Sequence, residues 1–171
     1  MACNITSGWE ISCKDSQGGI VKIYIANGPV EAYAETAGVL TSVTVAGSPL
    51  TPADFFEFEV PKQTSSLVEN VTASTENGTV FFDQQLILVF NKMEASKRNQ
   101  ILLMAQNEDM FVVAKDGNGK YWSIGLTRGA SLIAGALTSG VAYGDRNGGE
   151  LTLQGLEPAP MFEVTPSIVQ A

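Results

Sequence analysis

Residues 65–91, SSLVENVTASTENGTVFFDQQLILVFN, decide the fold because they read as one long β-hairpin. Two runs of mixed polar and apolar residues, 65–75 and 79–91, meet at Asn77-Gly78. Asn-Gly between such runs predicts a tight hairpin turn in which both turn residues take positive φ. At about 3.3 Å per residue the second run would span about 43 Å, well beyond an ordinary strand. The hairpin should therefore protrude from a small domain or pair with neighbouring chains.

Strand alternation gives each run of this hairpin one largely apolar face and one polar face. In the simplest interpretation the polar faces are the solvent-exposed side of ordinary strands in a β-sandwich. In the alternative, long strands with free edges associate, and a ring of such hairpins closes a barrel with a polar lumen. That lumen would be uncharged or slightly acidic. The polar faces of the two runs include Asn70, Thr72, Ser74, Asp83 and Gln85.

The segments around the hairpin predict further strands and one helix. Residues 92–106 have helical spacing, with Met93, Ile101, Leu102 and Ala105 expected to face the domain. A second hairpin over 110–126 should turn at 116–119, and small residues over 129–141 predict strands that permit close backbone approach. Further strands are expected at 20–26, 38–46, 54–60 and 150–156. We therefore expect a mainly β chain: a β-sandwich or incomplete barrel with one flanking α-helix and a long protruding β-hairpin.

The two ends of the chain are predicted to be an arm and a tail on a single domain spanning residues 1–171. Residues 1–17 have no sustained period, but Ile5, Trp9 and Ile11 carry more apolar area than a frayed terminus usually does. An arm that binds another molecule is the favoured interpretation. Residues 157–171 contain Pro158 and Pro160, which predict a stiff, exposed tail.

Composition argues against several classes of function. The 171 residues include 18 acidic and 10 basic side chains, so the formal charge is −8. This negative charge argues against a protein that binds nucleic acid through contacts with phosphate. There is no histidine, so the Ser-His-Asp triad and the commonest metal ligand are both missing. We expect no enzyme, no metal and no cofactor. The sequence contains no run of about 18 apolar residues, so we expect no membrane-spanning segment. The start of the sequence lacks the pattern of a secretory signal.

The order of these parts resembles the tail tube proteins of tailed bacteriophages. The matching stretches are residues 1–25 (MACNITSGWEISCKDSQGGIVKIYI), 76–92 (ENGTVFFDQQLILVFNK), 115–125 (KDGNGKYWSIG) and 140–155 (GVAYGDRNGGELTLQG). In that family, subunits form homohexameric rings that stack into a conduit for DNA ejection, and a long hairpin contributes strands to an inner barrel. One departure is Gly149, where the resemblance leads us to expect an aromatic residue after the Asn-Gly turn.

This resemblance implies a role for each part of the chain. Residues 65–91 would line the lumen. The side chains that would face the DNA are Asn70, Thr72, Ser74, Asp83 and Gln85, and the DNA would be transient cargo that is not specifically bound. The arm carrying Ile5, Trp9 and Ile11, and the loops around Pro49 and Pro61, would contact neighbouring subunits and rings. The implied partners are other copies of the chain and other tail proteins, with no membrane. The implied location is the virion tail, after assembly in the host cytoplasm. The acidic balance would let phosphate pass without ion pairing, or would serve only to keep an abundant protein soluble.

Two other interpretations stay open at this stage. The chain could be another virion component, such as a capsid decoration or tail terminator subunit, although the long hairpin argues against this. It could also be a ligand- or carbohydrate-binding β-sandwich module that uses Trp9, Tyr121 and Trp122 as an aromatic platform. Tyr121 and Trp122 are adjacent in a strand, so one ring must point inward, which favours core packing for that ring.

Overall fold

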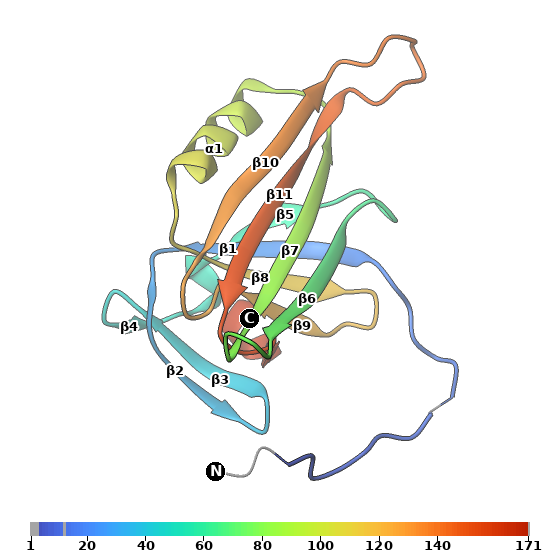
Figure 1. Ribbon diagram of the computed structural model, residues 1–171. Helices are drawn as coiled ribbons and strands as arrows, with labels where there is room; N and C mark the ends of the chain where they lie inside the picture. Colours follow the sequence, from blue (N-terminus) through green and yellow to red (C-terminus); the bar gives the residue numbers. More distant parts are fainter. Residues whose placement is uncertain (1–3, 12, 171) are drawn as a thin grey trace.

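The computed structural model describes residues 4–11 and 13–170. Within them the chain is mainly β, with one mixed sheet of twelve strands, two helices and no closure into a barrel (Figure 1). The predicted class, a sandwich or incomplete barrel, is confirmed. The elements are β1 (Ile20–Asn27), β2 (Val30–Thr36), β3 (Val39–Val45), β4 (Ser48–Pro49), a 3₁₀ turn (Pro52–Asp54), β5 (Phe56–Glu59), β6 (Ser66–Ser74), β7 (Thr79–Asn91), α1 (Ala95–Gln106), β8 (Met110–Asp116), β9 (Tyr121–Ile124), β10 (Ala130–Thr138), β11 (Gly148–Glu157), β12 (Glu163–Val164) and α2 (Pro166–Val169).

The sheet folds back on itself to make two packed layers. Its strand order is β2-β3-β12-β9-β8-β10-β11-β7-β6, and β1 pairs with both β8 and β5. β10 joins β8 through a single pair, Ala130 with Met110. Beyond that pair, β10, β11, β7 and β6 form an antiparallel layer of their own, which crosses over β1, β8 and β9 (Figure 1). We call these four strands the outer sheet.

Two apolar clusters fix this arrangement, one on each side of β1 and β8. The first lies between the layers and includes Ile23, Val112 and Leu153. The second lies on the opposite side, where Phe111 and Val113 pack with residues of β3 and α2. β1 and β8 are apolar on both faces because both are covered, as expected for central strands buried on two sides. The outer sheet is covered on one face only.

The long hairpin is present, but its turn differs from the prediction. β6 and β7 pair without interruption from Ser66–Ile87 to Ser74–Thr79. β11 pairs with β7 from Phe82 to Asn91, so only the end of the hairpin extends beyond its neighbour. The loop 75–78 has four residues, and of Asn77 and Gly78 only Gly78 has positive φ. The predicted two-residue turn is wrong because Ser74 Oγ accepts the Asn77 N–H (3.2 Å) and holds a wider loop.

Helix α1 begins three residues later than predicted and presents a different face to the domain. Met104 is its buried residue and Ile101 is half-buried, whereas Leu102 and Ala105 are exposed. Lys97 sets the rotation: its Nζ donates to the backbone oxygens of Asn91 (2.6 Å) and Lys92 (3.0 Å). Positions 97, 101 and 104 therefore face inward. The prediction is confirmed for Ile101 and is wrong for Met93, Leu102 and Ala105, which are exposed.

The last segment of the chain is not an exposed tail. β12 pairs with β3 and β9, and α2 follows it, with Pro166 in the first helical turn where proline is favoured. Val164, Ile168 and Val169 are buried in the second apolar cluster. The Tyr121 hydroxyl donates to Gln170 Oε1 (2.5 Å) and closes the segment onto β9. The predicted exposed tail is wrong because these apolar side chains complete the core.

Candidate functional site

The exposed face of the outer sheet is the candidate site, and we call it the polar face. Residues that pair directly across strands lie on the same side of a sheet, so the pairs Asn70–Asp83, Gln85–Gln154 and Thr152–Ala134 define it. Its members are Ser66, Val68, Asn70, Thr72 and Ser74 in β6; Thr79, Phe81, Asp83, Gln85 and Ile87 in β7; Glu150, Thr152, Gln154 and Leu156 in β11; and Ala134, Ala136 and Thr138 in β10.

Asp83 is the organising group of the polar face. Its two carboxylate oxygens accept hydrogen bonds from Gln85 Nε2 (2.9 Å) and from Gln154 Nε2 (2.6 Å). The first bond runs along β7 and the second crosses to β11. Two amide donors on one half-buried carboxylate fix three side chains relative to each other.

The charge on this face is of one sign. β6, β7, β10 and β11 contain no lysine or arginine, so no cation arises from any of the four strands. Asp83 and Glu150 are the carboxylates on the exposed side, whereas Glu69 and Glu157 point toward the core. Glu157 accepts the backbone N–H groups of Thr127 and Arg128, a structural role. The polar face offers uncharged hydrogen-bonding groups and repels anions such as phosphate.

The covered side of the outer sheet explains the departure at Gly149. A Cβ atom added there would lie 2.8 Å from Phe90 Cζ and 2.7 Å from Leu137 Cδ2. An aromatic side chain therefore has no room at this position. The ring of Phe90 from the adjacent strand occupies the space instead, so the apolar anchor comes from β7 rather than from β11.

Both long edges of the outer sheet lack a strand partner among the described residues. β6 pairs with β7 alone, and β10 beyond Ala130 pairs with β11 alone. A β-bulge between Leu132 and Ala134 interrupts β10, and residues 134–138 then continue in regular register. Free backbone N–H and C=O groups along such edges are a template for another strand.

The five residues predicted for the lumen lie together on the polar face, as strand alternation requires. The residues predicted for subunit contacts are dispersed. Ile5, Trp9 and Ile11 are exposed on an arm that extends away from the domain (Figure 1). Pro49 is exposed in β4, and Pro61 is half-buried in the turn between β5 and β6. Sequence reasoning missed Glu150, Thr152 and Gln154, although alternation over 150–156 indicates their common face.

The aromatic platform of the binding-module alternative does not form. Tyr121 is buried in the second cluster beside Tyr24, with ring centroids 6.2 Å apart. Trp122 is half-buried and donates its Nε1–H to Asp116 Oδ2 (3.2 Å). Trp9 lies on the arm, away from both. The three rings therefore make no common surface.

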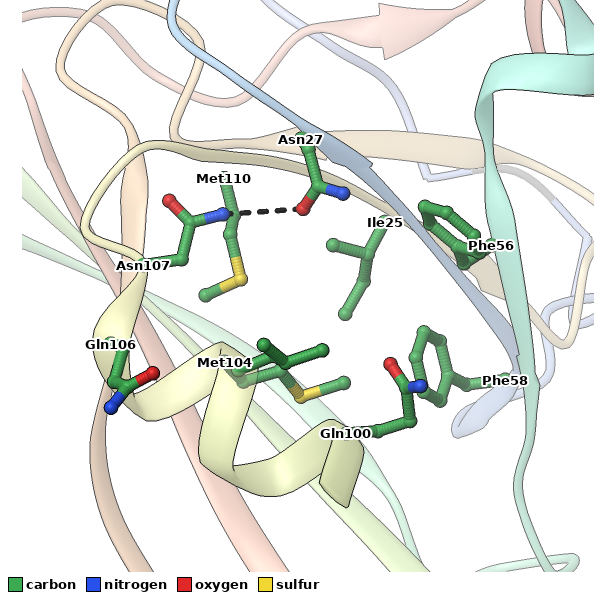
Figure 2. Close-up of a pocket in the computed structure, with 10 residues that line it drawn as sticks. Ile25, Asn27, Phe56, Phe58, Gln100, Met104, Gln106, Asn107 and Met110 are labelled. Carbon is green, nitrogen blue, oxygen red and sulfur yellow. Dashed lines mark hydrogen bonds between the residues drawn. The ribbon is translucent and has the colours of Figure 1, made fainter. Parts of the chain in front are cut away.

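A second candidate is a groove beside α1, shown in Figure 2. It has a volume of about 490 Å³ and is lined by apolar side chains with a few amides, such as Asn107, whose Nδ2 donates to Asn27 Oδ1 (3.2 Å). It holds no charged side chain, so it offers no acid–base pair.

Neither a metal-binding cluster nor a membrane-spanning helix occurs among residues 4–11 and 13–170. No group of three His, Cys, Asp or Glu side chains in this range could hold a metal ion. No helix in the same residues is long and apolar enough to cross a membrane. No protein-family model matches the chain, and no curated protein or solved structure is significantly similar to it.

Proposed function

We propose that the chain is a structural subunit that assembles into stacked rings and forms the tail tube of a tailed bacteriophage, a conduit for DNA. One observation carries the proposal: a four-stranded antiparallel sheet has a cation-free polar face and two unpaired edges. Nothing in the polar face resembles a catalytic or ligand-binding constellation. It is a surface suited to lining a passage.

Strand directions permit a closed ring. β6, β7, β11 and β10 alternate in direction, so β6 and β10 run antiparallel to each other. When identically oriented subunits are placed head to tail, β6 of one meets β10 of the next in antiparallel orientation. Such heterologous contacts close into a ring, and the joined outer sheets become a barrel without edges. The bulge in β10 adds the local bend that a closed sheet needs.

The charge of the polar face supports DNA as cargo. DNA-binding proteins gain affinity by placing lysine and arginine against phosphates, each contact releasing counterions. The outer sheet has none of these side chains, and the whole chain carries a net charge of −8. A barrel lined by Asn70, Asp83 and Gln85 would hydrate its contents and let phosphate move without ion pairs.

Electron microscopy of the purified, concentrated full-length protein tests the assembly. We expect stacked rings or hollow tubes in negative stain. Only monomers at every concentration, including in the presence of the tail components that nucleate a tube, would contradict the proposal.

Adding positive charge to the polar face tests the lumen. Gln85→Lys with Thr152→Lys places two cations on the central strands, away from the edges. We expect tubes of this variant to retain short duplex DNA in a nuclease-protected, salt-sensitive form, whereas wild-type tubes retain none. The control is Thr36→Lys with Ser42→Lys, which adds the same charge at exposed sites of β2 and β3. Equal protection by both variants would place the polar face outside the lumen.

A further inference from the structure

The groove of Figure 2 continues past α1 into a larger trough. A second hollow of about 430 Å³ lies on the other side of Met104 and shares Phe58, Gln100 and Met104 with the first. We call the two together the helix groove. Its walls are the face of β1 and β5 on one side and α1 on the other, and its apolar wall includes Ile25, Phe56, Phe58, Leu103, Met104 and Met110.

The helix groove leaves large apolar side chains in water. Phe56 is 58% exposed and Leu103 is 57% exposed. The rotation of α1 that turns Met104 into the core places Leu103 at the groove's mouth. Exposed apolar side chains gathered in one hollow are typical of a binding site. The second hollow also has charged side chains in its lining, namely Glu57, Glu59 and Lys97.

The chain carries a matching segment in its N-terminal arm. Ile5, Trp9 and Ile11 are all more than nine-tenths exposed, with Trp9 at 96%. All three occupy odd positions, so an extended backbone places them on one side over about 20 Å. Tryptophan is a large, rigid anchor that gains most from an apolar pocket. The remaining residues of the stretch are small or polar and would face water.

The arm and the helix groove lie at opposite ends of β1. The base of the arm is held near Ile20: the Gln17 N–H donates to Asn118 Oδ1 (2.6 Å) and the Gly117 N–H donates to the Gly19 oxygen (3.0 Å). The groove opens beside Ile25 and Asn27, and the arm leads away from α1 (Figure 1). A projection at one end and its complement at the other favour head-to-tail contact between copies.

We propose that residues 5–11 of one copy bind in the helix groove of a neighbouring copy, with Trp9 as the anchor. Among the described residues β5 pairs with β1 alone, so its second edge is open to backbone hydrogen bonds from an extended segment. The inference rests on the proposed function, because stacked rings supply the neighbouring copy. It names the surface through which the arm acts.

Photo-crosslinking of the full-length chain tests the contact. Trp9 is replaced by p-benzoylphenylalanine, and equal amounts of ¹⁴N- and ¹⁵N-labelled protein are mixed under assembly conditions and irradiated. We expect crosslinked peptides that join the arm of one isotope to the segment around Phe56 or Leu103 of the other. Crosslinks within a single copy, crosslinks to other surfaces, or none above background would each overturn the proposal.

Two neighbouring leucines of α1 provide a matched pair of variants. Leu103→Glu places a carboxylate in the groove, whereas Leu102→Glu, at a residue 47% exposed, lies outside it. We expect the crosslink yield to fall at least about tenfold for Leu103→Glu and to stay unchanged for Leu102→Glu. An unchanged yield with Leu103→Glu would overturn the proposal. Both side chains are already exposed, so both variants should fold.

The outcomes separate this inference from the proposed function. Tubes in the microscope without a crosslink to the groove would reject the arm contact and leave the tube subunit standing. A mixed-isotope crosslink to the groove, in a protein that never forms rings or tubes, would support the arm contact and reject the tube.

Discussion

The sheet ends in two strands, β2 and β6, whose free edges differ. β2 pairs with β3 through two irregularities, between Val30 and Ala32 and between Ala34 and Glu35. Its Glu35 and Glu31 carboxylates accept the N–H groups of Gly38 (3.0 Å) and Gly47 (2.8 Å) in the adjacent turns. β6 pairs with β7 over nine consecutive residues without a shift, and its one charged residue, Glu69, points toward the core.

This difference supports β6, rather than β2, as an associating edge in the proposed ring. Bulges and charges are the usual devices that keep an edge strand from pairing with another chain, and β2 has both. β6 has no register shift, no proline and no lysine, and its one charged residue is the inward-pointing Glu69. A protein that had to remain monomeric would protect both ends of its sheet. Here the end that carries the polar face is the one left open.

The largest expected effect comes from protecting the open edge. Val68→Lys with Thr72→Lys adds two cations to β6, where lysine disfavours strand addition. We expect the concentration needed for assembly to rise at least about tenfold, or about 1.4 kcal/mol per contact, while the monomer stays folded. Sedimentation velocity measures assembly and circular dichroism measures folding.

The matched control changes the protected edge. Ala32→Lys with Ala34→Lys adds the same charge to exposed positions of β2 and should leave assembly unchanged. If both double variants weakened assembly equally, net charge rather than the β6 edge would be responsible, and the contrast between the edges would fail.

The next effect concerns the strands that support the open edge. β6 is held by β7, which is held in turn by β11, and Gly149 lets β11 approach Phe90. Gly149→Ala should lower the free energy of unfolding by about 1–3 kcal/mol, the usual range for overpacking a core. Gly144→Ala in the adjoining loop has no atom within 4 Å of the new Cβ and should change stability by less than about 0.5 kcal/mol. Urea denaturation compares the two, and equal midpoints would contradict the packing argument.

The strands and the polar side of the hairpin were predictable because strand alternation is a local property. A period of two assigns Asn70 and Asp83 to one side of their strands without any knowledge of the rest of the fold. The contribution of Gln154 was not predictable in the same way. It depends on the pairing of β7 with β11. The residues of these two strands that pair near Asp83 are more than 60 positions apart in the chain.

The errors in the hairpin turn and in α1 share a cause, which is a side-chain hydrogen bond to nearby backbone that the sequence pattern does not encode. Asn77-Gly78 has the strongest two-residue turn signal, yet the paired positive φ values occur at Ala37-Gly38 and Ala46-Gly47. The face of α1 is set by Lys97 binding the end of β7, which helical periodicity does not encode. The helix groove follows from that rotation, so it could not be predicted either.

A smaller effect should sharpen the contrast at the protected edge. Ala37 in the β2–β3 turn has φ of 53°, a left-handed conformation that costs a residue with a Cβ about 1–2 kcal/mol and that asparagine tolerates better. Ala37→Asn should raise the free energy of unfolding by about 0.5–1 kcal/mol, whereas Ala37→Val should lower it. Neither should alter assembly, because the proposed contact between copies uses β6 and β10 rather than β2. A stabilised variant with changed assembly would contradict that assignment.

The smallest effect is expected in the loop that connects the second open strand, β10, to β11. The Asp145 carboxylate accepts the N–H groups of Val141 and Ala142 (2.8 Å each), and these bonds hold its pKa below the ordinary value of 3.8. A lowered pKa means that the ionised form stabilises the folded loop. This contribution is complete above about pH 5 and is lost as the pH falls through the lowered pKa.

Amide exchange at these two positions measures that contribution directly. Protection of the Val141 and Ala142 amides should fall on acidification, and Asp145→Asn should reduce it at neutral pH, because a neutral amide oxygen is the weaker acceptor. Global stability should stay the same, since the loop is exposed and lies outside both apolar clusters. Arg146→Gln is the control, because it changes the charge next to Asp145 without removing the acceptor. If Arg146→Gln lowered protection as much as Asp145→Asn, general loop electrostatics rather than these two hydrogen bonds would order the end of β10.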